Sequence, residues 1–161
     1  MNSDNSQNLA LRNIFGKFAT GVSIVSFYNK KGIPKGITVN SFSSVSLNPP
    51  IVLWCLDNNS DLYDELSITE KYVFNFLSIE QANIATKLSE KENHHFETIN
   101  YFDNENGPVI EKSLGWISCS KKEIIKAGDH LIILGLVNNF EIFKNNEKPL
   151  IFWSGKYQDF I

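Results

Sequence analysis

Short apolar runs with strand-like alternation recur along most of this chain, and they constrain its fold more than any other feature. Residues 22–28 and 37–46 alternate between apolar and polar side chains on either side of turn residues, which predicts a β-hairpin. The apolar run 51–56 is short enough to be a central strand, buried on both faces. The same kind of pattern predicts further strands at residues 71–77, 116–127, 130–143 and 149–153. Strands joined in this way favour a mainly β, mostly antiparallel fold that closes wholly or partly into a barrel.

Helical spacing is limited to short segments between these strands. It occurs at residues 8–18, 60–67 and 80–88, so a few short helices are predicted. The chain has 161 residues, which is the size of one ordinary domain. We therefore predict a single domain over residues 1–161, with residues 1–8 as a disordered tail.

Charge and composition exclude several classes of partner. The formal net charge is -3 and Arg12 is the only arginine, so the guanidinium groups that bind nucleic-acid phosphates and guanine edges are missing. No apolar run approaches the roughly 20 residues of a membrane-spanning helix, and the start MNSDNSQN lacks the features of a secretory or transit peptide. We therefore predict a soluble, cytoplasmic protein with neither a nucleic-acid nor a membrane partner. Cys55 and Cys119 lie within apolar runs, which is typical of buried thiols.

The stretch GITVNSFSSVSLNPP, residues 36–50, is unusually rich in hydroxyl and amide side chains. In a strand, alternation would place Thr38, Asn40, Phe42 and Ser44 on one face. The pyrimidine ring of a flavin has two carbonyl oxygens and one N–H, and such a row of donors and acceptors suits it. A polar edge strand that runs into a Ser-rich turn explains the same residues without a ligand, so both interpretations stay open.

A second signal lies between two apolar runs in IIKAGDHLIILGLV, residues 124–137. Gly128 suits a tight turn that needs a positive φ. Asp129 and His130 are predicted to point to opposite faces of the strand, so they need not be partners. His130 fits a hydrogen-bond donor or proton relay at a ligand. A turn capped by Asp129 beside a solvated histidine explains the same residues, so this alternative also stays open.

Five stretches carry a resemblance when they are taken together and in order. They are FATGVSIVS (18–26), GITVNSFSSVSLNPPIVLWCL (36–56), YVFNFLSIEQANIATKLS (72–89), GWISCSKKEIIKAGDHLIILGLV (115–137) and PLIFWSGKY (149–157). The chain thereby resembles the flavin reductase-like family, the short-chain NAD(P)H:flavin oxidoreductases. The resemblance covers nearly the whole chain after Leu11, and the ordered pair of G-x-T-x-N-S-F and G-D-H is more specific than either motif alone.

The resemblance implies a fold, a reaction and a set of site residues. The fold is an FMN-binding split β-barrel with a few short peripheral helices, usually a homodimer. The reaction passes a hydride from NADH or NADPH to FMN or FAD. The implied site residues are Thr38, Asn40, Ser41 and Phe42 along the isoalloxazine, Ser60 at the flavin phosphate, Lys87 and Ser89 as weaker candidates for the same anion, His130 at the nicotinamide, and Tyr157 over the stacked rings.

The long polar stretch 91–108 departs from the family. The family often carries a basic residue in this loop, where this chain has NHHF. His94 and His95 with Glu97 make a poor metal site, so we predict no metal and a solvated loop. No arginine follows position 12 to bind a 2′-phosphate, which favours NADH over NADPH.

We therefore predict a flavin reductase that supplies reduced flavin to a separate monooxygenase. Exposed aromatic side chains at Phe152, Trp153 and Phe160 predict a homodimer. One alternative is a non-enzymatic flavin-binding module or electron carrier on the same barrel. A second is a relative acting on a pyridoxal-type phosphate, for which one arginine is too few. A third is a flavin-free barrel that serves as a dimerisation or small-ligand module.

Overall fold

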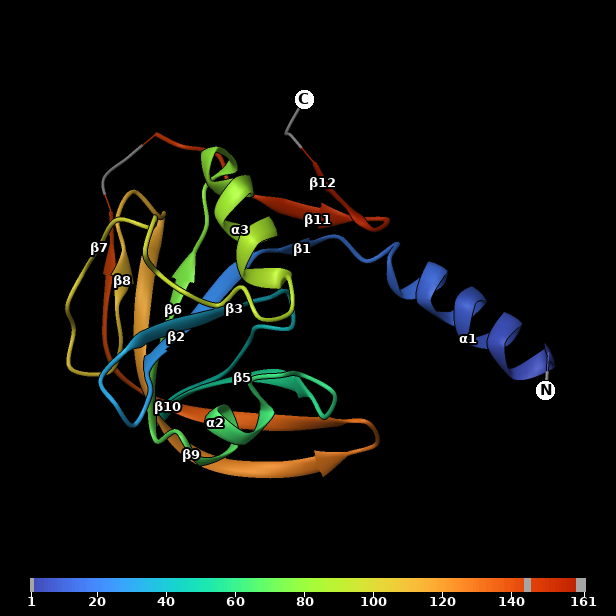
Figure 1. Ribbon diagram of the computed structural model, residues 1–161, viewed down its shortest axis with the longest axis horizontal. Helices are drawn as coiled ribbons and strands as arrows, with labels where there is room; N and C mark the ends of the chain where they lie inside the picture. Colours follow the sequence, from blue (N-terminus) through green and yellow to red (C-terminus); the bar gives the residue numbers. More distant parts are fainter. Residues whose placement is uncertain (1, 144–145, 159–161) are drawn as a thin grey trace.

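The computed structural model describes residues 2–143 and 146–158, and it is built mainly from β-strands (Figure 1). The elements follow in the order α1 (Asn2–Phe15), β1 (Thr20–Gly21), β2 (Ser23–Tyr28), β3 (Pro34–Val39), β4 (Ser43–Leu47), β5 (Pro50–Asp57), α2 (Tyr63–Ile68), β6 (Lys71–Phe76), the 3₁₀ helix η1 (Ile79–Gln81), α3 (Ala82–Ser89), β7 (Tyr101–Phe102), β8 (Val109–Ile110), β9 (Gly115–Ala127), β10 (His130–Ile142), β11 (Ile151–Trp153) and β12 (Lys156–Gln158). The predicted mainly β fold with a few short helices is confirmed.

A 7-stranded antiparallel sheet in the order β3-β2-β6-β9-β10-β5-β4 forms the body of the molecule. The two ends of this sheet, β3 and β4, are consecutive in the chain and are joined only by residues 40–42. The predicted hairpin of residues 22–28 with 37–46 is therefore correct only in part. β2 pairs with β3 as far as Val39, and the chain then crosses to the opposite end of the curved sheet (Figure 1).

The two longest strands, β9 and β10, belong to both halves of the sheet. Residues 115–120 of β9 pair with β6, whereas residues 130–136 of β10 pair with β5. Register shifts in the β9–β10 pairing occur before Gly135 and before Asn139, where these two regions overlap. A Cβ at Gly135 would overlap the hydroxyl group of Tyr72, so the packing at this bend requires glycine.

Burial on both faces is found in β2 and β6 rather than in the predicted run 51–56. Val25 on one face of β2 belongs to the main core, and Ile24 on the other face packs with side chains of α3. In β5 the burial alternates, with Trp54 almost fully buried and its neighbours partly accessible. β5 lies beside the end strand β4, so the prediction that this strand is central was wrong.

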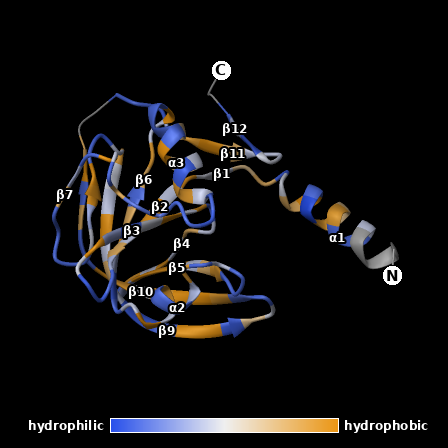
Figure 2. Ribbon diagram, viewed as in Figure 1, coloured by the Kyte–Doolittle hydropathy of each residue, from blue (hydrophilic) through white to orange (hydrophobic). Residues whose placement is uncertain are grey.

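Helix α1 extends away from the sheet, and apolar residues occur along it (Figures 1 and 2). It begins at Asn2, within the segment 1–8 for which the sequence predicted a disordered tail. Exposed apolar side chains of this region are Leu9, Leu11, Ile14, Phe15 and Phe18. In the described part of the chain, no helix is long and apolar enough to cross a membrane. The single-domain division over residues 1–161 stays a prediction.

Candidate functional site

Four of the predicted site residues lie at the end of β3 and in the connection from β3 to β4, and two of their hydroxyl groups have structural partners. Thr38 Oγ1 donates a hydrogen bond to the carbonyl oxygen of Ala85 in α3, at 2.7 Å. Ser41 Oγ accepts from the backbone N–H of Cys55 at 2.9 Å and donates to the carbonyl oxygen of the same residue at 3.3 Å. These bonds fasten the connection to α3 on one side and to β5 on the other.

The remaining two residues of this connection, Asn40 and Phe42, line a hollow of about 430 Å³. The Phe42 ring packs edge-on against Phe74 and Phe76, with both centroids 5.0 Å away. The Asn40 side chain is exposed, so its amide is accessible beside this hollow. The other lining residues are Phe18, Ala19, Thr20, Gly21, Val22, Ser23, Phe76, Leu77, Leu114, Pro149 and Leu150. The hollow therefore combines a largely apolar wall with an accessible amide, which is the combination that an amphipathic ring system needs.

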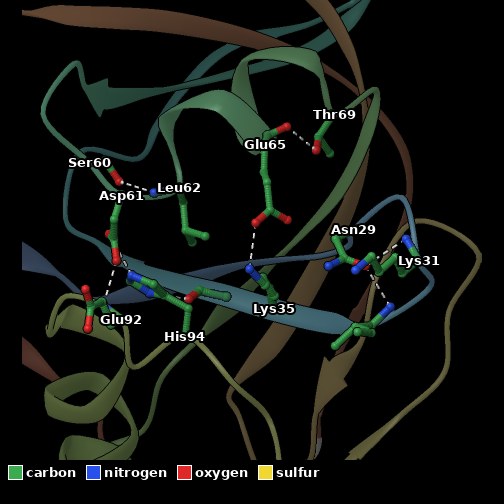
Figure 3. Close-up of polar contacts among 12 residues, drawn as sticks. Asn29, Lys31, Lys35, Ser60, Asp61, Leu62, Glu65, Thr69, Glu92 and His94 are labelled. Atoms are coloured by element: carbon green, nitrogen blue, oxygen red, sulfur yellow. Dashed lines mark hydrogen bonds and ion pairs between the residues drawn. The ribbon is translucent and has the colours of Figure 1, made fainter.

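Ser60 and His130 are brought close together by the pairing of β5 with β10. Asp57, at the end of β5, pairs with His130 at the start of β10. The turn that follows β5 is tied to the β9–β10 hairpin because the N–H of Asn58 donates to the carbonyl oxygen of Asp129 at 3.0 Å. Ser60 Oγ accepts from the N–H of Leu62 at 3.2 Å, which orders the approach to α2 (Figure 3).

The structure corrects the expectation that Asp129 and His130 need not be partners. Gly128 has a φ of 62° in the hairpin turn, and His130 Nδ1 lies 2.8 Å from Asp129 Oδ1. Hydrogen bonding to His130, and then its charge, hold the pKa of Asp129 below the usual carboxyl range. Nδ1 of the His130 ring therefore faces a carboxylate, and Nε2 is the ring nitrogen that this contact does not use.

Lys87, Ser89 and Tyr157 form a separate group on α3 and β12. Lys87 Nζ donates to Thr98 Oγ1 at 2.9 Å, and Ser89 Oγ donates to the carbonyl oxygen of Thr86 at 2.7 Å. Burial raises the pKa of Tyr157, and hydrogen bonding with Ser89 and Thr86 partly offsets this rise. Tyr157 therefore packs by its ring while its hydroxyl group faces the end of α3.

The sequence analysis considered His94 only as part of a poor metal site, and the prediction that it lies in a solvated loop was wrong. Its side chain is almost fully buried, with the residue 5% exposed. Nδ1 lies 3.1 Å from the carbonyl oxygen of Gly36, and Nε2 lies 2.8 Å from Asp61 Oδ1 (Figure 3). The alternation of His94, exposed His95 and buried Phe96 is the one sequence signal that could have indicated this docking.

Asp61 completes this contact from the turn after β5. Its second carboxylate oxygen, Oδ2, accepts from the N–H of Glu92 at 2.6 Å. Burial acts to raise the pKa of Asp61, but the hydrogen bonds from Glu92 and His94 outweigh it and the pKa lies below the ordinary value. Among the residues that the structure describes, no cluster of three or more histidine, cysteine or acidic side chains could hold a metal ion.

Comparisons with known proteins point to one family. Residues 15–160 match the family described as "Flavin reductase like domain". A probable flavin reductase of Rhizobium meliloti (strain 1021) is 38% identical over 133 residues, which are 82% of this chain and 43% of that protein. This chain therefore spans less than half the length of that relative.

In two further comparisons the match covers most of this chain and most of the other protein. The reductase subunit HsaB of a flavin-dependent monooxygenase of Mycobacterium tuberculosis (strain CDC 1551 / Oshkosh) is 30% identical over 148 residues, covering 91% of this chain and 79% of that one. The structure of the NADH:FAD oxidoreductase SgcE6 of Streptomyces globisporus C-1027, solved in complex with NAD and FAD fragments, superposes with a TM-score of 0.89. The two sequences are 28% identical, and the match covers 97% of this chain and 94% of the other.

Proposed function

Because this chain belongs to the flavin reductase-like family, we propose that it is an NADH-dependent flavin reductase that reduces FMN or FAD. The observation that carries the proposal is that β5 connects the two sequence motifs. Ser41 of the first motif is hydrogen-bonded to Cys55, and His130 of the second motif pairs with Asp57, two residues further along the same strand. A ring bound along the first motif would therefore lie near the second.

The isoalloxazine ring is proposed to bind along residues 38–42. Since the hydroxyl groups of Thr38 and Ser41 already have protein partners, the accessible Asn40 amide and the backbone of this connection supply the polar contacts. Phe42 offers apolar contact at the hollow. When bound, the flavin supplies the redox chemistry, and the chain holds and orients the reactants.

The phosphate of the flavin is proposed to bind at Ser60, in the turn after β5. Ser60 Oγ only accepts a hydrogen bond from Leu62 and keeps its O–H for an anion. Lys87 and Ser89 on α3 are weaker candidates for the same anion, because both already donate to protein acceptors. Tyr157 is proposed to close over the stacked rings.

His130 is proposed to orient the nicotinamide. Its position at the start of β10 is fixed by pairing with β5 and by the contact with Asp129. The imidazole then places Nε2 as a hydrogen-bonding group for the hydride donor without having to act as an acid or base. NADH is preferred over NADPH because Arg12 is the only arginine in the chain.

Three further proposals concern the partners and the location of the enzyme. A separate monooxygenase that receives reduced flavin is supported by the name of the Mycobacterium relative. A homodimer is supported by the exposed apolar side chains of α1 and by Trp153, which is 43% exposed, whereas Phe152 is half-buried and Phe160 lies outside the described residues. A cytoplasmic location is supported by the free thiols of Cys55 and Cys119.

The test is anaerobic mixing of the purified protein with NADH and either FMN or FAD. Loss of both the nicotinamide and the oxidised-flavin absorbance is expected, faster than without protein. Flavin binding without reduction by NADH or NADPH would refute the enzyme and favour a flavin-binding module or electron carrier. Failure to bind either flavin would leave a small-ligand or dimerisation barrel.

A further inference from the structure

His94 connects two segments that the proposed function assigns to opposite ends of the flavin. On one side its Nδ1 contacts the carbonyl oxygen of Gly36, two residues before Thr38 on β3. On the other side its Nε2 contacts the carboxylate of Asp61, the residue after Ser60 (Figure 3). The imidazole therefore spans from the strand that precedes the ring-binding segment to the turn that would bind the phosphate.

Both nitrogens of the His94 ring face hydrogen-bond acceptors. A neutral imidazole donates from one nitrogen only, whereas the doubly protonated ring donates to both the Gly36 carbonyl and the Asp61 carboxylate. The contact between Nε2 and the carboxylate oxygen of Asp61 is short, at 2.8 Å, and its acceptor carries the charge of the carboxylate. Charge-assisted hydrogen bonds of this kind are about twice as strong as neutral ones, so this contact can hold a turn in place.

The His94 ring is itself held rigidly against β3. The N–H of Gly36 donates to the carbonyl oxygen of His94 at 3.1 Å, and Lys35 and His95 form an antiparallel bridge. Phe96 is 4% exposed and lies where a Cβ on Gly36 would collide with its ring. His94 is therefore held in place against β3 by the segment that carries it.

The other contacts of the turn lead away from β3. The N–H of Ser60 donates to the carbonyl oxygen of Asp57, and that of Asn58 donates to Asp129 on the hairpin. A second ion pair, Lys35 to Glu65 at 2.6 Å, joins β3 to α2 beyond the turn (Figure 3). Ser60 is bonded locally to Leu62 and Tyr63, whereas the contacts of Asp61 tie this end of the turn to the segment of His94 docked on β3.

We propose that His94 is a positioning residue that sets the distance between the ring-binding segment of β3 and the phosphate-binding hydroxyl group of Ser60. This inference rests on the proposed function, because it needs a flavin at that site. It assigns His94 a role in selecting flavins that carry a phosphate, with no contact between His94 and the flavin. Loss of the contact would leave the ring-binding segment in place, since β2 pairs with β3 through Val39.

The test compares the dissociation constants of FMN and of riboflavin, which has the same ring and no phosphate. In His94→Leu the dissociation constant for FMN should rise about tenfold, which corresponds to about 1.4 kcal/mol. The reason is that part of the free energy of FMN binding must then be used to order the turn. That for riboflavin should change less than about twofold, since the ring contacts remain. His94→Gln keeps a donor toward Asp61 and should recover most of the FMN affinity. The KM for FMN should rise in His94→Leu while kcat at saturating FMN is retained.

The variant Asp61→Ala tests whether Asp61 acts by positioning the turn or by the negative charge of its carboxylate. Positioning predicts weaker FMN binding, and the double variant with His94→Leu should be no weaker than either single variant. If Asp61 acted only by charge, removing its carboxylate would tighten FMN binding instead. Tyr28→Phe is the matched control, because it also removes one side-chain hydrogen bond to a carboxylate, that of Asp103, at a remote place.

An unchanged ratio of FMN to riboflavin affinity in folded His94→Leu and Asp61→Ala would overturn the proposal. So would an equal loss of both affinities, because that indicates general destabilisation. If His94→Leu does not fold, the result for Asp61→Ala decides. Wild-type protein that binds neither flavin would instead refute the proposed function, so the two failures are distinguishable.

Discussion

Replacing Ser41 by alanine should weaken the fold more than it weakens flavin binding. The Ser41 hydroxyl group accepts from the N–H of Cys55 and donates to its carbonyl oxygen. The pairing of β4 with β5 begins only at Ser43 and Leu53, so Cys55 lies beyond that ladder. Without the hydroxyl group, one N–H and one carbonyl oxygen at the edge of β5 lose their partner.

The size of the effect follows from these two bonds. A typical hydrogen bond contributes about 0.5–1.5 kcal/mol net, and the bond at 3.3 Å is the weaker of the two. Both residues are half-buried, so water can replace part of the loss. We expect the free energy of unfolding to fall by about 1–2 kcal/mol and the melting temperature by about 3–6 °C.

The measurements are urea and thermal unfolding of the flavin-free protein, together with FMN titration. Ser43→Ala is the matched control, because that hydroxyl group is exposed and donates only to the carbonyl oxygen of the next residue. Ser41→Thr keeps the hydroxyl group and should retain more of the stability than Ser41→Ala. Unchanged stability in Ser41→Ala together with lost FMN binding would refute the reasoning and make the side chain a flavin ligand.

Three further predictions concern the β9–β10 hairpin, the bend in the sheet at Gly135, and the loss of stability at acid pH. His130→Ala should slow NADH-dependent reduction about tenfold or more in stopped flow, while the FMN dissociation constant changes less than about threefold; equal effects on both would contradict its nicotinamide-side role. Gly135→Ala should lower the free energy of unfolding by about 1–3 kcal/mol in urea, because its methyl group meets Tyr72; a neutral result would show that the bend relaxes. The pKa of Asp61 is lowered in the folded protein, so its stabilisation is present above the unfolded value of about 4 and is lost as pH falls through the folded value. The stability difference between the wild type and Asp61→Asn should therefore shrink from pH 6 to pH 3, and a constant difference would show that the hydrogen bonds to the Asp61 carboxylate do not stabilise the fold.

Local patterns predicted the strands well, whereas the order of the strands depended on distant contacts. Alternation alone indicated β2, β9 and β10 because each residue's neighbours two positions away share its face. The same alternation ran through residues 37–46 and hid the crossing at 40–42, since nothing local distinguishes a continued strand from one that changes partners. The central position wrongly predicted for 51–56 has the same origin.

The site was predictable in composition but not in its supporting contacts. Both motifs were recognised in the sequence. The hydrogen-bond partners of Ser41 and Thr38, however, lie 14 and 47 residues away in the chain. His94 is buried against Asp61, 33 residues earlier, and apart from the alternation of His94, His95 and Phe96 such a pairing leaves no local signal. The Asp129 to His130 contact was missed for the opposite reason, because the tight turn at Gly128 breaks the alternation that a regular strand would impose.

The hydrogen bond from Asn58 to Asp129 couples the binding of FMN to the binding of NADH, which would otherwise be independent. This bond joins the turn that contains Ser60 to the end of the hairpin that contains His130, so the two move as one unit. A ligand that immobilises the turn therefore also restricts the hairpin end, and the reverse is also true. We expect the two substrates to bind cooperatively, so that prior occupancy by FMN raises the affinity for NADH and prior occupancy by NADH raises that for FMN to the same degree. Riboflavin should produce less of this mutual enhancement than FMN, and equal enhancement by the two flavins would show that the unit does not transmit the effect.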